Sequence, residues 1–125
     1  MARCGRMDRV HQLLTGLCEE LEQQLKPNLW GVKGLLIRGY LPQTWVFETE
    51  YGESTLFMDA EGNARVFPGP CHNRDLTIRW KRDSLLSVLE SRSRDSIPEG
   101  DYPDVVVQTE RGRVAFNYLK KNIGL

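Results

Sequence analysis

Apolar residues first recur at intervals of three and four, which predicts a helix over residues 7–26. One side of this helix carries an apolar stripe, and the other side carries mainly glutamine and glutamate. The stripe consists of Met7, Val10, Leu14, Leu17 and Leu21. Pro27 follows, and proline cannot donate the backbone hydrogen bond that would continue the helix. The pattern therefore indicates a helix that packs against a core by one side.

From Val32 to Trp80 the period of the apolar positions falls to two, which is the period of strands. Strand patterns occur in TWVFETEY, in STLFMDAEGNARVF and in DLTIRW. The second of these predicts a hairpin, because two apolar runs flank residues 59–63, where glycine and asparagine tolerate positive φ. VKGLLIRGYL, which is apolar on both faces, is a candidate for a central strand.

The second half returns to helical spacing. Asp83 or Ser84 suits the N-cap of a helix in SLLSVLE, and residues 91–104 form the longest predicted loop. VVVQT predicts a short last strand, and RVAFNYLKKNIGL a terminal helix. The predicted order is helix, four strands, helix, strand and helix. This order indicates an α+β domain with one face of the sheet covered by helices.

Size and charge narrow the classes of protein. A chain of 125 residues suits one domain, 1–125, that can bury a core without disulfide or metal support. Seventeen basic residues balance seventeen acidic ones, so no overall charge attracts nucleic acid or an anionic membrane. The basic segments around Arg79 and Arg92 are diluted by aspartates, and Trp80 is in phase with core positions rather than free for base stacking.

The three cysteines, Cys4, Cys18 and Cys71, are odd in number and widely spaced. That spacing fits reduced thiols in the cytoplasm better than a disulfide framework or a zinc site. No apolar run is long enough for a stable membrane insertion, and the charged start is followed by no signal-peptide core. We expect no metal and no cofactor.

Two groups of residues are candidates for catalysis. Cys71 and His72 offer a thiol and a base, but adjacent residues rarely aim their side chains at each other. Glu99, Asp101 and Asp104 lie in a proline-containing loop, where a solvated turn explains them more simply than a paired-carboxylate site. The large aromatic rings remain: they either fill the core or line an apolar cavity, and the sequence leaves both open.

DLTIRW followed by SLLSVLE resembles the most recognisable stretch of the sterol-carrier-protein-like family (type 2 domains). The N-terminal helix, the meander WVFETEYGESTLFMDAEGNARVFPG and the closing VVVQTERGRVAFNYLKKNIGL are similar to that family in their order. The resemblance implies a five-stranded, mostly antiparallel sheet with helices on one face. Between them it implies an apolar tunnel that binds or transfers a fatty acid, fatty acyl-CoA, sterol or other lipid without covalent chemistry.

On this resemblance the expected lining consists of inward strand residues and of residues from the second and the terminal helices. These are Phe47, Phe57, Leu76, Ile78, Leu86, Leu89, Val107, Phe116, Leu119 and Ile123. Two features depart from the family: the polar segment at 91–104 replaces a glycine- and alanine-containing stretch, and the end NIGL differs from a Ser-Lys-Leu address.

Two other functions stay open. The same fold with a filled core would serve as a packing or homodimerisation module without a lipid. An enzyme would have to be centred on Cys71 and His72.

Overall fold

The computed structural model describes residues 2–28 and 39–125. Its elements run in the order helix, four strands, helix, strand and helix, as predicted. Their bounds are α1 (Ala2–Leu25), the 3₁₀ helix η1 (Lys26–Asn28), β1 (Gln43–Thr49), β2 (Gly52–Met58), β3 (Ala64–Pro68), β4 (Leu76–Arg79), α3 (Arg82–Ser91), β5 (Asp104–Val107) and α4 (Glu110–Ile123). The candidate strand VKGLLIRGYL lies mostly outside the described residues, and residues 39–41 belong to no strand.

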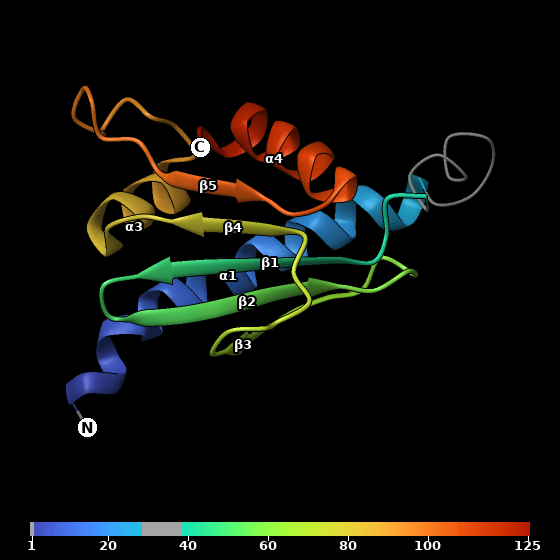
Figure 1. The fold of residues 1–125 in the computed structure, drawn as a ribbon, viewed down its shortest axis with the longest axis horizontal. Coiled ribbons are helices and arrows are strands. Elements are labelled where there is room, and N and C mark those ends of the chain that lie inside the picture. Colours follow the sequence, from blue (N-terminus) through green and yellow to red (C-terminus); the bar gives the residue numbers. More distant parts are fainter. Residues whose placement is uncertain (1, 29–38) are drawn as a thin grey trace.

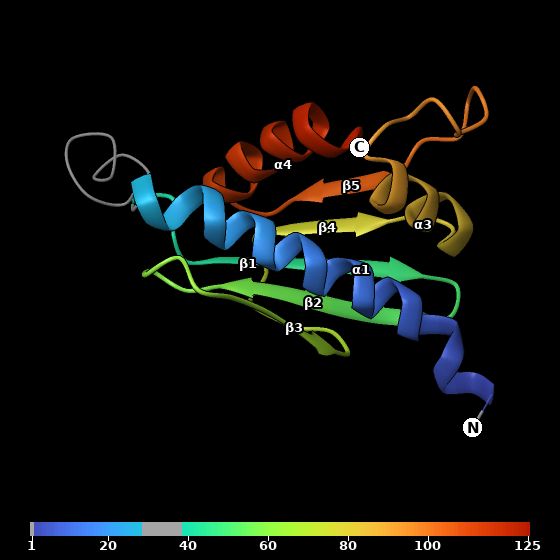
Figure 2. The same ribbon diagram turned by 180° about the vertical axis from the view of Figure 1, so that it is seen from behind.

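The five strands form one sheet in the order β3-β2-β1-β4-β5 (Figure 1). Three neighbouring pairs are antiparallel and the pair β1–β4 is parallel, which confirms a mostly antiparallel sheet. Helices α1, α3 and α4 lie on the same face (Figure 2), as expected, and none of the described residues places a helix on the other face. Because β3 and β4 both run parallel to β1, the chain between them crosses the helix-free face.

The pleat of the strands decides which side chains meet the helices. Trp45 and Phe47 of β1 face the helices, and the register places Leu56 and Leu76 on either side of Trp45. On the other face, Val46 is fully buried although no helix covers it. The crossing segment covers that region, and the carbonyl oxygen of Gly69 in this segment accepts a hydrogen bond from the Thr55 hydroxyl at 2.8 Å.

The start of α3 differs from the prediction. Its N-cap residue is Lys81, and neither Asp83 nor Ser84 caps the helix. The carboxylate of Glu50, from the turn after β1, accepts from the backbone N–H of Arg82 at 2.7 Å and so satisfies a free end of the helix. The Ser84 hydroxyl instead donates to the carboxylate of Asp101. The sequence pattern predicted a cap from Asp83 or Ser84, whereas the hydrogen bond to this end of α3 comes from Glu50, which is distant in sequence.

The residue before β4, Asp75, is the buried polar centre of the fold, with a side chain that is 7% exposed. Its Oδ2 accepts from the backbone N–H of Thr44 at 2.9 Å, and its Oδ1 accepts from the Thr109 hydroxyl at 2.7 Å. Nη2 of Arg111 lies 3.3 Å from Oδ1. The Asp75 carbonyl oxygen also accepts from the N–H of Gln108 at 3.0 Å. One carboxylate therefore joins β1 and β4 to the turn that enters α4.

The first turn of α4 packs directly on Asp75. Thr109 is the N-cap, and its Oγ1 accepts from the N–H of Gly112 at 3.1 Å. A Cβ atom on Gly112 would lie 1.9 Å from the carbonyl oxygen of Asp75, so only glycine fits there.

We predict that Asp75→Ala lowers the free energy of unfolding by about 3 kcal/mol, because it leaves the buried N–H of Thr44 and the part-buried hydroxyl of Thr109 without their acceptor and removes the ion pair with Arg111. Asp83→Ala is the matched control: its side chain is 94% exposed, and it should change stability by less than about 0.5 kcal/mol. Urea denaturation measures both. Equal effects of the two substitutions would contradict the central role of Asp75.

We also predict opposite effects of alanine at two helical glycines. Gly112→Ala should destabilise the fold by about 1–3 kcal/mol, because the new methyl group overlaps the backbone of Asp75. Gly16→Ala in α1 meets no atom within 4 Å and should stabilise it by roughly 0.5–1 kcal/mol. Thermal unfolding of the two variants checks the signs, and a stable Gly112→Ala protein would show that α4 does not sit on Asp75.

Candidate functional site

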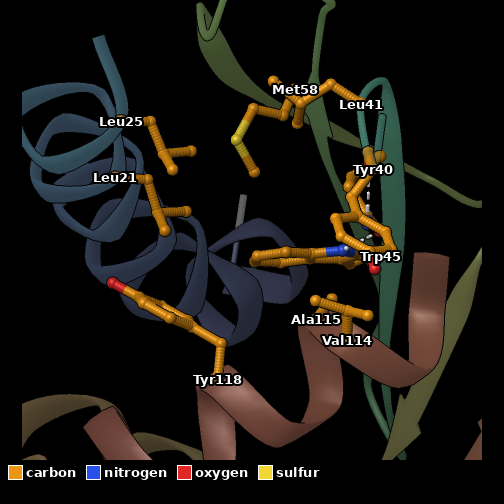
Figure 3. Close-up of a pocket in the computed structure, with 10 residues that line it drawn as sticks. Leu21, Leu25, Tyr40, Leu41, Trp45, Met58, Val114, Ala115 and Tyr118 are labelled. Carbon is orange, nitrogen blue, oxygen red and sulfur yellow. Dashed lines mark hydrogen bonds between the residues drawn. The ribbon is translucent and has the colours of Figure 1, made fainter. Parts of the chain in front are cut away.

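An apolar pocket of about 150 Å³ lies at the end of the helix–sheet layer where β1 begins and β2 ends (Figure 3). The last turns of α1, the first turns of α4, the start of β1 and the end of β2 surround it. Its lining residues are Leu21, Leu25, Tyr40, Leu41, Gln43, Trp45, Met58, Val114, Ala115 and Tyr118. Among these described residues, every side chain except the Gln43 amide is aliphatic, aromatic or a thioether, so this lining favours an apolar guest.

The pocket has a buried floor and an exposed rim. Leu21, Trp45, Met58 and Ala115 are buried. Rim residues Tyr40 and Val114 are 43% and 40% exposed.

Gln43 supplies the internal polar support of the pocket without offering a free polar group to a guest. Its Nε2 donates to the carbonyl oxygens of Tyr40 at 2.9 Å and Arg111 at 2.7 Å. Its Oε1 accepts from the indole N–H of Trp45 at 2.9 Å. Both amide hydrogens and the amide oxygen are thus engaged, as a buried amide requires. The Gln43 side chain thereby links the rim, the Trp45 ring and the start of α4.

Tyr118 closes the pocket between the two helices that flank it. Its ring lines the pocket from α4, and its hydroxyl donates to the side-chain oxygen of Gln24 on α1. Burial raises the pKa of the Tyr118 phenol above its usual range, and the charge of Glu20 raises it further.

Of the ten residues predicted to line a tunnel, six are fully buried in the solid core. They are Phe47, Leu76, Ile78, Leu89, Leu119 and Ile123. Three more, Leu86, Val107 and Phe116, are half-buried against that core. Among the described residues, however, none of the ten contributes to the lining of the pocket.

The placement of Phe57 among the inward residues was wrong. The register pairs Phe57 with Thr44, and it pairs Phe47 with Ser54. Successive strand residues face opposite sides, so Phe57 points to the face that no helix covers. There its ring lies under the guanidinium of Arg65, 5.7 Å from the ring centroid to Cζ. A turn of two residues between β1 and β2 sets this register. The alternation of apolar and polar residues within β2 does not by itself show which of the two sets faces the helices.

The loop at 91–104 is better ordered than the solvated turn expected from its sequence. The carboxylate of Asp101 accepts from the indole N–H of Trp80 at 2.8 Å and from the Ser84 hydroxyl. These hydrogen bonds hold the pKa of Asp101 below its usual range. Arg94 stacks on the rings of Trp80 and Tyr102. Trp80 is buried, as predicted, and is not available for stacking on a base.

The candidate nucleophile and base have no catalytic arrangement in the described part of the chain. The thiol of Cys71 donates to the carbonyl oxygen of Asn73 at 3.8 Å, and the His72 side chain is exposed. Burial, together with the charges of Glu22 and Glu19, raises the pKa of Cys18 to about 12, so this thiol is a poor nucleophile.

The described residues contain neither a group of metal ligands nor a membrane-spanning helix. No three histidine, cysteine, aspartate or glutamate side chains among residues 7–28 and 39–125 form a group that could hold a metal ion. Within the same ranges, every helix is too short or too polar to cross a bilayer.

No protein-family model matches the chain, and no curated protein matches it in sequence. Among solved structures, one described as "UbiJ-SCP2 Ubiquinone synthesis protein" is similar, with a TM-score of 0.42 and 16% sequence identity. The similarity covers 82% of this chain and 85% of that one.

Proposed function

We propose that this protein binds an apolar ligand, without covalent chemistry, in the pocket between α1, α4 and the start of β1. The observation that supports the proposal is an apolar pocket whose single polar lining side chain other than tyrosine, Gln43, already has three protein partners. A guest gains from leaving water and meets no unsatisfied amide there. Transfer of each methylene group from water contributes about 0.8 kcal/mol.

The volume of the pocket limits how much of a ligand it can enclose. Pockets that enclose whole small-molecule ligands usually measure roughly 300–1,000 Å³, whereas an apolar cavity of roughly 150 Å³ takes up benzene. The pocket of about 150 Å³ therefore suits a ring or the end of a chain, such as part of a fatty acid, a sterol or another lipid. We further propose that the protein is not an enzyme, needs no cofactor and works in the cytoplasm, where its thiols stay reduced.

A second candidate is a packing or homodimerisation module with no lipid ligand. The observation that favours it is the solid core, in which Phe47, Leu76 and Leu119 are fully buried where a tunnel was expected. On this alternative the exposed side chains of Tyr40 and Val114 at the pocket rim would serve an interface with a second copy.

Benzene binding distinguishes the ligand-binding function from the packing or homodimerisation module. With ¹³C-methyl-labelled methionine, we expect the NMR signal of Met58, which lines the pocket, to shift in a saturable manner on addition of benzene. Met7 is the internal control: its sulfur accepts from Thr49 at the far end of β1, about 20 Å along the strand from Gln43, and its signal should stay in place. At ten times the dissociation constant, benzene should raise the free energy of unfolding by about 1.4 kcal/mol.

Ala115→Leu should weaken benzene binding by roughly tenfold or more, because the larger side chain occupies the space of the guest. Val106→Leu is the matched control, since Val106 is exposed on β5 and faces away from the helices. If benzene leaves the Met58 signal unchanged and the protein sediments as a dimer, the packing module replaces the ligand-binding proposal.

A further inference from the structure

The pocket has an inner limit that can be traced along each element that lines it. Same-facing residues follow one another every two positions in a strand and about every four in a helix. One step inward from Leu21, Trp45, Met58 and Ala115 stand Leu17, Phe47, Leu56 and Leu119. These four are at most 2% exposed and belong to the core cluster. The pocket therefore ends against packed side chains on all four elements.

On the opposite side of the pocket, the rim formed by the described residues is exposed. Tyr40 and Val114 at the rim are exposed, and the hydrogen bond between Tyr118 and Gln24 closes the side between α1 and α4. Figure 3 shows Tyr118 facing Leu21 and Leu25 across the pocket. As far as the described residues bound the pocket, a long ligand can thus enter from the rim, and only part of it fits.

Polar groups of a ligand have no partner on the floor. The Gln43 amide and the Trp45 indole N–H bond to each other, and the remaining amide hydrogens bond to backbone carbonyls. Burying a polar group without a partner is costly. The end of the ligand that enters must therefore be the apolar end, and a polar head stays at the rim.

We propose that the pocket recognises the apolar end of its ligand by size and accepts about six carbon atoms, the content of the benzene that a cavity of roughly 150 Å³ takes up. This proposal rests on the proposed function. Selection then depends on the shape of the last carbons and not on the total length of the chain. Leu119 and Ala115 set the depth, because Ala115 forms the floor from α4 and Leu119 stands behind it.

The test is a series of straight-chain alcohols, from butanol to dodecanol, that compete with benzene for the pocket. The Met58 methyl signal reports displacement, and Met7 again serves as the internal control. Affinity should rise about fourfold for each added methylene up to about six carbons and then stay level. This measurement uses the unsubstituted protein, so its result does not depend on whether a variant folds.

Two variants should shift, in opposite directions, the alcohol length at which the affinity stops rising. Ala115→Val makes the pocket shallower and should bring the plateau to shorter alcohols, and Leu119→Ala removes packing behind the floor and should bring it to longer ones. Val106→Leu should leave the series unchanged.

A fourfold rise that continues through dodecanol would overturn the size limit while leaving apolar binding intact. An unresponsive Met58 signal with benzene and with every alcohol would overturn the proposed function itself.

Discussion

The buried carboxylate of Asp75 is the interaction on which the rest of the structure depends. It accepts from the backbone of Thr44 and from the N-cap residue of α4, and it lies within 3.3 Å of the Arg111 guanidinium. A buried charge is tolerated only where partners replace its water. The partners of Asp75 come from β1 and from the turn before α4, so satisfying this one charge fixes where α4 begins. The absence of a side chain on Gly112 lets the helix come close enough.

The position of α4 then determines the pocket. Val114, Ala115 and Tyr118 follow within two turns of the fixed N-terminus and face α1 across the pocket. Gln43 adds the second constraint, because its amide bonds to the carbonyl of Arg111 next to the Asp75 centre and to the Trp45 ring on the floor. The hydrogen bonds that satisfy the buried polar groups of Asp75 and Gln43 therefore also position the apolar side chains around the pocket.

The element order, the hairpin at 59–63 and the burial of Trp80 were predictable because they follow from local periodicity and turn chemistry. What failed depends on contacts between distant segments. The cap of α3 comes from Glu50, and the facing of Phe57 follows from the β1–β2 register. Phe47 and Leu119, predicted as lining, stand one step behind the pocket. Hydrophobic spacing identifies inward positions, but it does not show which of them lack a packing partner. A buried glutamine beside Trp45 and a small alanine on the α4 face were the available signals.

The central claim is that the space bounded by Leu21, Trp45, Met58 and Ala115 accepts an apolar guest. A crystal structure of the protein under xenon pressure tests this most directly, because xenon enters apolar cavities of this size and is located by its electron density. The account predicts a xenon peak among these four side chains. A structure with the space filled by protein atoms, or with xenon only between β4 and α3, would contradict it.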